Sequence, residues 1–454
     1  MKHAILDSIF HPNSVAVIGA TDQPAKHGNR IVRNLKSFGF EGKIYPVNPN
    51  REEIEGLPVY KSIEDIPGSV DLAIILVPAL VVPDILEQCS VKNVKGAIIV
   101  SGGFTESGEK GRDLERKCLD IARKNNIRII GPNCAGIFCA SSKLHASIAT
   151  QHPLPGLDFS IISQSGSLRR VSLLKSIEAR RTVSNYVNIG NQADLDLSDF
   201  LEYFGKYDPS SALVVFIESL KNGRNFIETA SNISKDKPII ALVAGVTDAG
   251  RSVSASHTGS MVSSTALYRA ALKKAGIIHV DDIEQVFGVL SLVLADTKFK
   301  DRRLALICPG GGLAVHVADL IESKGLLLPK LGESTQRKIG KSLSQVATIR
   351  FNPIDLGAVS SDMFLVSYET CLSALSLDRK IDGIIIITLG DFYFPDQFAD
   401  LTTKFCKEKP MLVIWMGNGE GVDAAKEKLR IHKIPLFTSA GLAIDALSKY
   451  LKVE

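Results

Sequence analysis

The chain has 454 residues, which predicts about three domains of roughly 150 residues each. Hydrophobic residues make up 45% and charged residues 22% of the sequence, a composition typical of packed globular domains. Fifty-three basic and 49 acidic residues leave a formal charge of +4 without any run of like charges. This balance argues against a dedicated nucleic-acid or membrane surface and leaves room for local phosphate pockets.

The longest apolar stretch, residues 71–86, is interrupted by proline and charge, so the sequence predicts no membrane span. The N-terminus lacks a basic region followed by a long apolar one, and we expect a cytoplasmic protein. Seven scattered cysteines, an odd number without a CxxC pair, argue against a disulfide framework. No His/Cys cluster has metal-ligand spacing, so we expect no metal site in this chain.

Short apolar runs alternate with amphipathic segments along the whole chain, which predicts parallel sheets covered by helices on both faces. The class is therefore α/β, with three consecutive doubly wound domains at residues 1–152, 153–298 and 299–454. The joints are the proline-rich stretch 149–158 and the charged stretch 295–303. The expected strands are 14–19, 43–47, 71–77, 95–100 and 127–130; then 159–162, 184–189, 212–217, 238–244 and 277–280; then 303–307, 326–328, 383–388, 411–415 and 434–437.

The first expected strand leads into a turn of small residues, Gly19, Ala20 and Thr21, before a helix. Such a turn lets backbone amides face a phosphate at the helix N-terminus, although the spacing is not GxGxxG. A NAD site would need an acidic residue after the second strand, where residues 47–49 read Val-Asn-Pro. With Lys26 and Lys43 nearby in sequence, the pattern favours coenzyme A, and an ordinary βα turn remains the alternative.

The segment 159–170, FSIISQSGSLRR, reads as strand, tight turn and helix. Amides of Ser165, Gly166 and Ser167 would form an anion site there, and the absence of glycine two residues before Ser165 excludes a nucleophile elbow. Glu218 ends another buried strand. It is a candidate partner for a histidine, or alternatively an ordinary first-turn acid of the next helix.

The segment 251–261, RSVSASHTGSM, carries one imidazole, His257, among small and hydroxylated residues, and we expect a flexible loop. A carboxylate such as Glu218 that accepts the Nδ1–H would leave Nε2 free as a nucleophile. A histidine nucleophile indicates phosphoryl transfer. The alternative is a solvated loop imidazole without a role.

Taken together, the motifs resemble those of the NDP-forming acyl-CoA synthetases, the superfamily that includes the α subunit of succinyl-CoA synthetase. The resemblance covers essentially the whole chain, in the domain order of the α subunit of archaeal ADP-forming acetyl-CoA synthetases. It rests on SVAVIGATD (14–22), GKIYPVNP (42–49), LVPA (76–79), SGGF (101–104), GPNCAG (131–136), SQSG (163–166), residues 187–203, FIESLKNGR (216–224), PIIALVAG (238–245), ASHTGS (255–260), residues 305–326, NPIDLG (352–357) and KPMLVIWMG (409–417).

The resemblance implies a Rossmann-like CoA-binding domain followed by two flavodoxin-like domains. It implies an acid–thiol ligase that interconverts acyl-CoA, ADP and phosphate with acid, CoA and ATP through acyl phosphate and phosphohistidine. His257 would carry the phosphoryl group, Glu218 would stabilise it, and the turn at 165–167 would hold phosphate. CoA would contact Gly19, Ala20, Thr21, Lys26, Lys43, Val77, Pro78 and Ala79.

The family architecture also implies a partner, because no ATP-grasp portion is present in this sequence. A separate β subunit would bind ADP or ATP with Mg²⁺, most simply in an α2β2 heterotetramer. After SQSG the family usually continues with small residues, whereas here Arg169 and Arg170 follow Ser-Leu. Arg170 is a candidate for holding the acid substrate, or it solvates a helix face.

Two other functions stay open at this point. The chain could be a CoA-sensing or scaffolding protein that kept the fold without turnover, or a NAD-dependent dehydrogenase. The retained histidine, carboxylate and phosphate turn favour the ligase, and the missing acidic residue near Asn48 weakens the dehydrogenase.

Overall fold

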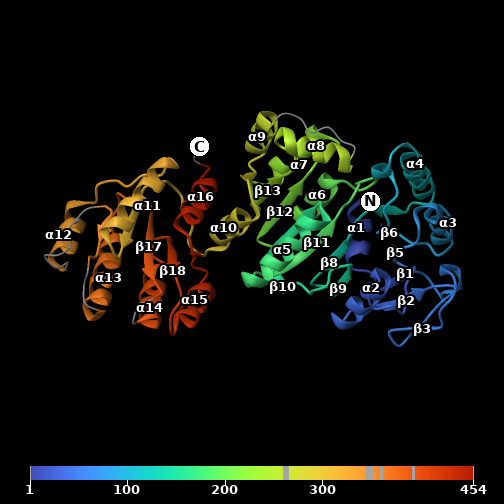
Figure 1. Cartoon of the computed structure of the whole chain (residues 1–454), viewed down its shortest axis with the longest axis horizontal. Coiled ribbons are helices and arrows are strands. Elements are labelled where there is room, and N and C mark those ends of the chain that lie inside the picture. The colour runs from blue at the N-terminus through green and yellow to red at the C-terminus, as the bar shows by residue number, and fades with distance from the viewer. Residues whose placement is uncertain (1, 259–264, 343–351, 358–360, 391–393, 453–454) are drawn as a thin grey trace. The chain divides into compact units, whose positions relative to one another are not determined.

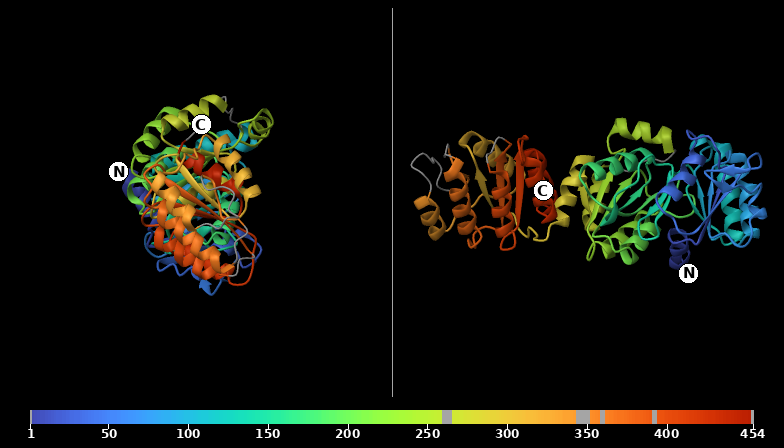
Figure 2. Two further views of the ribbon diagram at one scale, coloured as in Figure 1. Left: turned by 90° about the vertical axis from the view of Figure 1, so that its left-hand side faces the viewer. Right: turned by 90° about the horizontal axis from the view of Figure 1, so that it is seen from below.

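The computed structural model describes residues 2–258, 265–342, 352–357, 361–390 and 394–452, without the side chains of a few residues next to the gaps, 254–258 among them (Figure 1). The chain forms two compact units, Met1–Asp281 and Asp282–Glu454. The first unit contains two large sheets and the second contains one. Each sheet has helices on both faces, as Figures 1 and 2 show.

The first sheet is parallel and has the order β2-β1-β5-β6-β7. Helix α2 leads from β1 to β2, and α3 and α4 cover the opposite face, so the sheet is doubly wound. Its elements are α1 (Lys2–Phe10), β1 (Ser14–Ile18), α2 (His27–Ser37), β2 (Lys43–Val47), the hairpin β3 (Glu53–Ile54) and β4 (Leu57–Pro58), η1 (Ile63–Asp65), β5 (Leu72–Ile75), η2 (Ala79–Val81), α3 (Val82–Val91), β6 (Gly96–Ile99), η3 (Thr105–Ser107), α4 (Glu109–Lys124) and β7 (Arg128–Ile130).

The second sheet has the order β14-β13-β12-β10-β11-β8-β9, in which β8 and β9 pair antiparallel at one edge. Its five parallel strands repeat the order of the first sheet. Its elements are β8 (Gly136–Cys139), β9 (Leu144–Ser147), β10 (Pro155–Ser163), α5 (Gly166–Glu178), β11 (Val183–Asn188), α6 (Leu197–Tyr207), β12 (Ala212–Ile217), α7 (Gly223–Ile233), β13 (Ile239–Val243), α8 (Asp248–Thr258), α9 (Thr265–Lys274) and β14 (Ile278–Val280).

The second unit holds the parallel sheet β16-β15-β17-β18-β19, again wound in the same order. Helices α12 to α15 pack in sequence along one face, and α16 packs with α10 and α11 on the other. Its elements are α10 (Ile283–Leu294), β15 (Leu304–Cys308), α11 (Gly311–Ser323), α12 (Glu333–Ser342), β16 (Ile354–Asp355), α13 (Ser361–Leu375), β17 (Gly383–Leu389), α14 (Pro395–Phe405), β18 (Met411–Met416), α15 (Val422–Ile431), β19 (Leu436–Phe437) and α16 (Ala440–Tyr450).

One continuous apolar core joins the first two sheets. Val15 and Ile74 of the first sheet belong to the same buried cluster as Ile162 and Val215 of the second. A bidentate ion pair adds a polar link, because Arg128 Nε and Nη2 donate to Asp194 at 2.7 and 3.1 Å. These contacts explain why residues 1–281 form one unit.

The three-sheet α/β architecture is as predicted, and three segments differ from the sequence-based expectation. Strands β8 and β9 extend the second sheet although residues 136–147 were expected in the first domain. Residues 326–328 form only an isolated bridge, Leu327 with Arg303, and β16 takes the place expected for a strand there. The division at residues 152 and 298 stays a prediction.

The expected loop at 251–261 is the third difference, because residues 248–258 are the helix α8. No proline occurs between Asp248 and Thr258, and glycine occurs only at 250. Thr247 Oγ1 accepts the Gly250 N–H at 3.1 Å, and Arg251 pairs with Asp248 one turn earlier. Residues 259–261 lie outside the described part of the chain.

Candidate functional site

A first cavity of about 570 Å³ opens at the carboxyl edge of the first sheet. It lies where Gly19 follows β1, Leu76 follows β5 and Ser101 follows β6. This is the point at which the strand order reverses, the usual ligand site of an open parallel sheet. Thr21 and Lys26 also line the cavity, as expected from the sequence.

Two glycines let the backbone pass close to itself at this edge. Gly19 has φ +87°, and a Cβ there would lie 3.0 Å from the carbonyl oxygen of Leu76. A Cβ on Gly28 would lie only 2.3 Å from the carbonyl oxygen of Gly19. The first turn of α2 therefore packs directly on the loop, and its N-terminal amides face the cavity side without a side-chain cap from Lys26.

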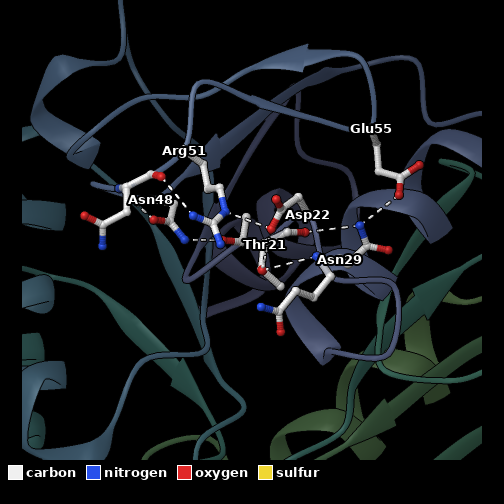
Figure 3. Close-up of polar contacts among 9 residues, drawn as sticks. Thr21, Asp22, Asn29, Asn48, Arg51 and Glu55 are labelled. Carbon is white, nitrogen blue, oxygen red and sulfur yellow. Dashed lines mark hydrogen bonds and ion pairs between the residues drawn. The ribbon is translucent and has the colours of Figure 1, made fainter.

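Side chains behind the loop fix its shape (Figure 3). Asn48 Nδ2 donates to the carbonyl of Ala20 at 2.7 Å, and Asn29 Nδ2 donates to that of Thr21 at 3.1 Å. Arg51 Nε reaches from the segment after β2 to Asp22 Oδ1 at 2.8 Å. This hydrogen bond lowers the pKa of Asp22. Sequence reasoning missed Arg51, whose place four residues beyond the end of β2 was the available signal.

Lys43 does not belong to this cavity. It is the first residue of β2 and pairs with Ser14 at the start of β1, whereas Gly19 follows the end of β1. At about 3.3 Å per residue the two ends are about 13 Å apart, so Lys43 lies at the opposite edge of the sheet. Val77, Pro78 and Ala79 follow Leu76 at the correct edge, where Ser101 Oγ donates to the Val77 carbonyl.

A second cavity of about 440 Å³ lies at the carboxyl edge of the second sheet. Ser165, Gly166 and Ser167 line it at the N-terminus of α5, as predicted. Ser165 is the N-cap and accepts the Leu168 N–H at 3.3 Å, and its Oγ lies 3.0 Å from Ser167 Oγ. Amides and hydroxyls at a helix N-terminus form a ready site for an oxyanion.

Asn188 at the end of β11 supports this turn from below. Its Nδ2 donates to the carbonyls of Ser163 and Gln164 at 2.9 and 3.2 Å, and its Oδ1 accepts the Ala135 N–H at 2.6 Å. The side chain is 1% exposed and lines the second cavity. Three chain segments thus meet on one amide.

Gln164 ties Glu218 to the same turn. Its Oε1 accepts the backbone N–H groups of Glu218 and Ser219, and its Nε2 donates to the Ser219 carbonyl at 2.6 Å. Glu218 lines both the second cavity and a third of about 650 Å³. The structure therefore brings the predicted carboxylate and the predicted phosphate turn together.

The three cavities adjoin one another. His27 and Val100 line both the first and the second, while Gln164, Gly190, Asn191 and Glu218 line both the second and the third. His27 is the first residue of α2, and burial, with the Arg30 charge nearby, lowers its pKa. A path of hollow space thus leads from the Gly19 loop past the Ser165 turn to Glu218.

His257 belongs to α8, and its side chain lies outside the described part of the structure. Helix α8 lies against η3. Thr105 of η3 lines the third cavity together with Glu218. Helix α8, which carries His257, therefore contacts an element that lines the cavity containing Glu218.

Arg169 and Arg170 differ in their surroundings. Arg170 is exposed on α5 and is not among the residues that line the three cavities. Arg169 is 3% exposed and lies under the helix, with its guanidinium carbon 5.2 Å from the ring centre of Tyr186. The sequence suggested Arg170 as a substrate-binding residue, but in the structure it is Arg169 that is buried beneath α5.

Two further observations concern the described residues only. They contain no cluster of three or more His, Cys, Asp or Glu side chains arranged to hold a metal ion. None of their helices combines the length and the apolar character that a membrane span requires.

Comparisons with known proteins agree with this geometry. Residues 13–140 match the family model described as CoA binding domain, and residues 157–293 match that described as succinyl-CoA ligase like flavodoxin domain. The chain is 37% identical over 442 residues to the α subunit of acetate–CoA ligase [ADP-forming] II from Pyrococcus furiosus, across 95% of this chain and 94% of that one.

A longer relative and a solved structure show the same similarity. The chain is 35% identical to acetate–CoA ligase [ADP-forming] I from Archaeoglobus fulgidus, of whose length it spans 64%. The solved structure of acetyl-coenzyme A synthetase 1 from Candidatus Korarchaeum cryptofilum, in complex with phosphate and ADP, matches with a TM-score of 0.87 and 32% identity over 99% of this chain and 97% of that one. The chain therefore belongs to the family of ADP-forming acetate–CoA ligases and aligns with their α subunit along nearly its whole length.

Proposed function

We propose that this ligase interconverts acyl-CoA, phosphate and ADP with the free acid, CoA and ATP, and that the chain described here supplies the acyl-transfer and phosphohistidine steps. The observation that carries the proposal is the adjacency of the three cavities. They connect a CoA-type loop at Gly19 with an oxyanion turn at Ser165 and a carboxylate at Glu218. The relatives reported above are enzymes by name and give no support to a sensor or scaffold.

The first cavity suits coenzyme A. Gly19 and Gly28 leave no Cβ between the loop and the helix, so the backbone amides at the start of α2 stay accessible to a phosphate. Lys26 is exposed at the rim and supplies a cation. We propose contacts from Gly19, Ala20, Thr21, Lys26, Val77, Pro78 and Ala79, and we withdraw Lys43 because it lies at the other edge of the sheet.

The thioester would then reach the second cavity. There an oxygen of phosphate, held by the amides and hydroxyls of residues 165–167, attacks the thioester carbonyl. The carbon–sulfur bond breaks, CoA leaves as a thiolate that takes up a proton, and acyl phosphate remains at the turn. The amides hold the attacking phosphate in place before the reaction, and the negative charge that develops lies on the thioester carbonyl oxygen and then on the leaving sulfur.

His257 would next attack the phosphorus of acyl phosphate. A nitrogen–phosphorus bond forms, the phosphorus–oxygen bond to the acyl group breaks, and the acid leaves as a carboxylate. We propose that Glu218 accepts the other ring N–H of His257 and stabilises the charged imidazole. Phosphohistidine then transfers its phosphoryl group to ADP.

The names of the α-subunit relatives imply a partner subunit. We propose that this partner is an ATP-grasp β subunit that binds ADP or ATP with Mg²⁺, in an α2β2 assembly. We further propose a cytoplasmic location, which suits seven cysteines that are all buried and unpaired.

The test is phosphate-dependent release of CoA from acetyl-CoA, followed with a thiol reagent on the chain together with its partner subunit and without nucleotide. Wild-type protein should release CoA only when phosphate is present. His257→Ala should still release CoA and accumulate acyl phosphate, because histidine acts after that step. Phosphate-independent hydrolysis, or no release with any acyl-CoA from a folded complex, would overturn the proposal.

A further inference from the structure

We infer that Arg169 is a built-in counter-charge for the phosphoryl group held at the Ser165–Ser167 turn. The inference rests on the proposed function and adds to it a positioning residue that acts through the electric field beneath the anion site. The observation behind it is that Arg169, a cation buried beneath α5, has no anionic partner among the described residues.

The Arg169 guanidinium is buried and incompletely bonded. The residue is 3% exposed, and among the described residues neither Nε nor Nη1 has a hydrogen-bond partner. No carboxylate in the described part of the chain forms an ion pair with it, and its contacts are with Tyr186, whose ring centre lies 5.2 Å from the guanidinium carbon and whose hydroxyl is hydrogen-bonded to Arg169. Arginine keeps its charge inside proteins, and a buried charge without a partner destabilises the fold.

The titratable groups around Arg169 are neutral and cannot compensate it. Burial raises the pKa of the Cys134 thiol to about 12, and burial also raises the pKa of Tyr186, whose hydroxyl bonds Ser147. Burial, followed by the His152 and Arg169 charges, lowers the pKa of His145 to about 3. The region beneath α5 therefore carries one uncompensated positive charge near neutral pH.

This charge lies close to the anion turn. Arg169 begins one helical turn after Ser165, whose carbonyl accepts its N–H at 3.2 Å. Helical side chains lean toward the N-terminus, so Arg169 reaches back under the turn. Cys134 lines the second cavity, and Tyr186 lies two residues before Asn188 on the same strand and face. Arg169 does not itself line the second cavity, so it would act on a phosphoryl group at the turn through the protein between them.

A buried, unpaired Arg169 should lower the stability of the free protein and raise its affinity for phosphate. Without an anion the buried guanidinium is a cost to the folded protein, and an anion in the second cavity offsets part of that cost through a medium of low dielectric constant. Replacing Arg169 with an apolar side chain of similar length should therefore leave the free protein as stable or more stable. The same change should weaken binding of phosphate.

The experiment compares Arg169→Met and Arg169→Lys with the matched control Arg170→Met on the exposed face of the same helix. Affinities for phosphate, acetate and CoA are measured separately by the shift in melting temperature on titration of the chain, and the Michaelis constants for the same three ligands are measured with the partner subunit. Arg169→Met should weaken phosphate binding at least about tenfold and leave CoA binding within twofold. Arg169→Lys should retain most of the phosphate affinity, and Arg170→Met should match wild type in phosphate affinity.

Three results would overturn the inference. Phosphate affinity of Arg169→Met within twofold of wild type excludes a counter-charge, and an equal loss of CoA affinity indicates a structural role only. Unchanged phosphate affinity with weaker binding of the acid would assign Arg169 to the acid's carboxylate. Because phosphate binding is read without turnover, a wild-type complex that binds phosphate but forms no ATP would contradict the proposed function and not the role of Arg169.

Discussion

The amide of Asn188 offers a sharp test of how the phosphate turn is supported. Asn188→Ala removes one acceptor and two donated hydrogen bonds from a side chain that is 1% exposed. Among the described residues the Ala135 N–H donates to Asn188 Oδ1, whereas the Ser163 carbonyl keeps a second partner, the Ile189 N–H at 2.9 Å. The losses at the three partners are therefore unequal.

The magnitude follows from this bonding. An unpaired buried N–H at Ala135 costs about 1–3 kcal/mol, and the two carbonyl bonds together contribute roughly 1 kcal/mol more. The sum is about 2–4 kcal/mol, which should lower the melting temperature of the first unit by roughly 4–8 °C. The Michaelis constant for phosphate should rise as well, because the turn loses its support.

Calorimetric melting of the purified chain measures the first effect. Asn232→Ala is the matched control, since Asn232 is exposed on α7 and receives only a 3.4 Å contact from Lys235. This control should stay within about 0.5 kcal/mol of wild type. A melting temperature of Asn188→Ala within 1 °C of wild type would refute the reasoning that this amide holds the three segments together.

Three further predictions concern other parts of the first unit. Gly28→Ala should weaken CoA binding at least about tenfold in calorimetric titration, because the added methyl carbon would lie 2.3 Å from the Gly19 carbonyl oxygen. The control Gly340→Ala has open space around the new methyl group and should bind CoA as wild type does. Equal CoA affinities of Gly28→Ala and wild type would contradict the prediction. Burial lowers the pKa of His145 to about 3, so its imidazole should show no NMR titration between pH 8 and 5. The unfolded chain takes up this proton below about pH 6.5 and the folded chain only near pH 3, so His145 should lower the free energy of unfolding as the pH falls between these values. An NMR titration midpoint of His145 near pH 6.5 would contradict its burial. Asp194→Ala should lower the free energy of unfolding by about 2–4 kcal/mol in urea, because it strands the largely buried Arg128 that links the first two sheets, and an unchanged urea midpoint would contradict that link.

The doubly wound architecture was predictable because the buried strands of a parallel sheet consist of continuous apolar runs in the sequence. Val15, Ile74 and Ile162 all lie in such runs, and all three sheets formed from them in the expected chain order. Strands β8 and β9 were missed because they form a short hairpin at one side of the sheet, and only β8 pairs with β11, which lies more than 35 residues further along the sequence. The short run at 326–328 was apolar but found only a single bridge.

The site was predictable where it follows from strand ends. Gly19, Ser165 and Glu218 each follow a strand, and the shared strand order brings the last two to one cavity. Lys43 was assigned to the wrong edge because the sequence argument did not consider the direction of β2. The strand begins at Lys43 and ends at the ligand edge, where Arg51 follows it. Arg169 could not be separated from Arg170 by sequence, because only the packing of α5 decides which of two adjacent side chains is buried.

The helical state of α8 also escaped the sequence. Serine, valine, histidine and threonine, which make up most of residues 252–258, have weaker intrinsic helix preference, so the local bonds at Thr247 and Arg251 help to decide the conformation. Helix α8 lies against η3, which lines the third cavity, and the role of His257 stays a prediction.

The most direct measurement is the site of phosphorylation. The chain together with its partner subunit is incubated with acetyl-CoA and radioactive phosphate, without nucleotide, and the label is characterised by acid lability and located by mass spectrometry. One acid-labile, base-stable phosphoryl group on His257, absent from His257→Ala and reduced in Glu218→Gln, is the expected result. Label on a serine, or no label on a folded chain that binds both CoA and phosphate with its partner subunit present, would contradict phosphohistidine as the intermediate.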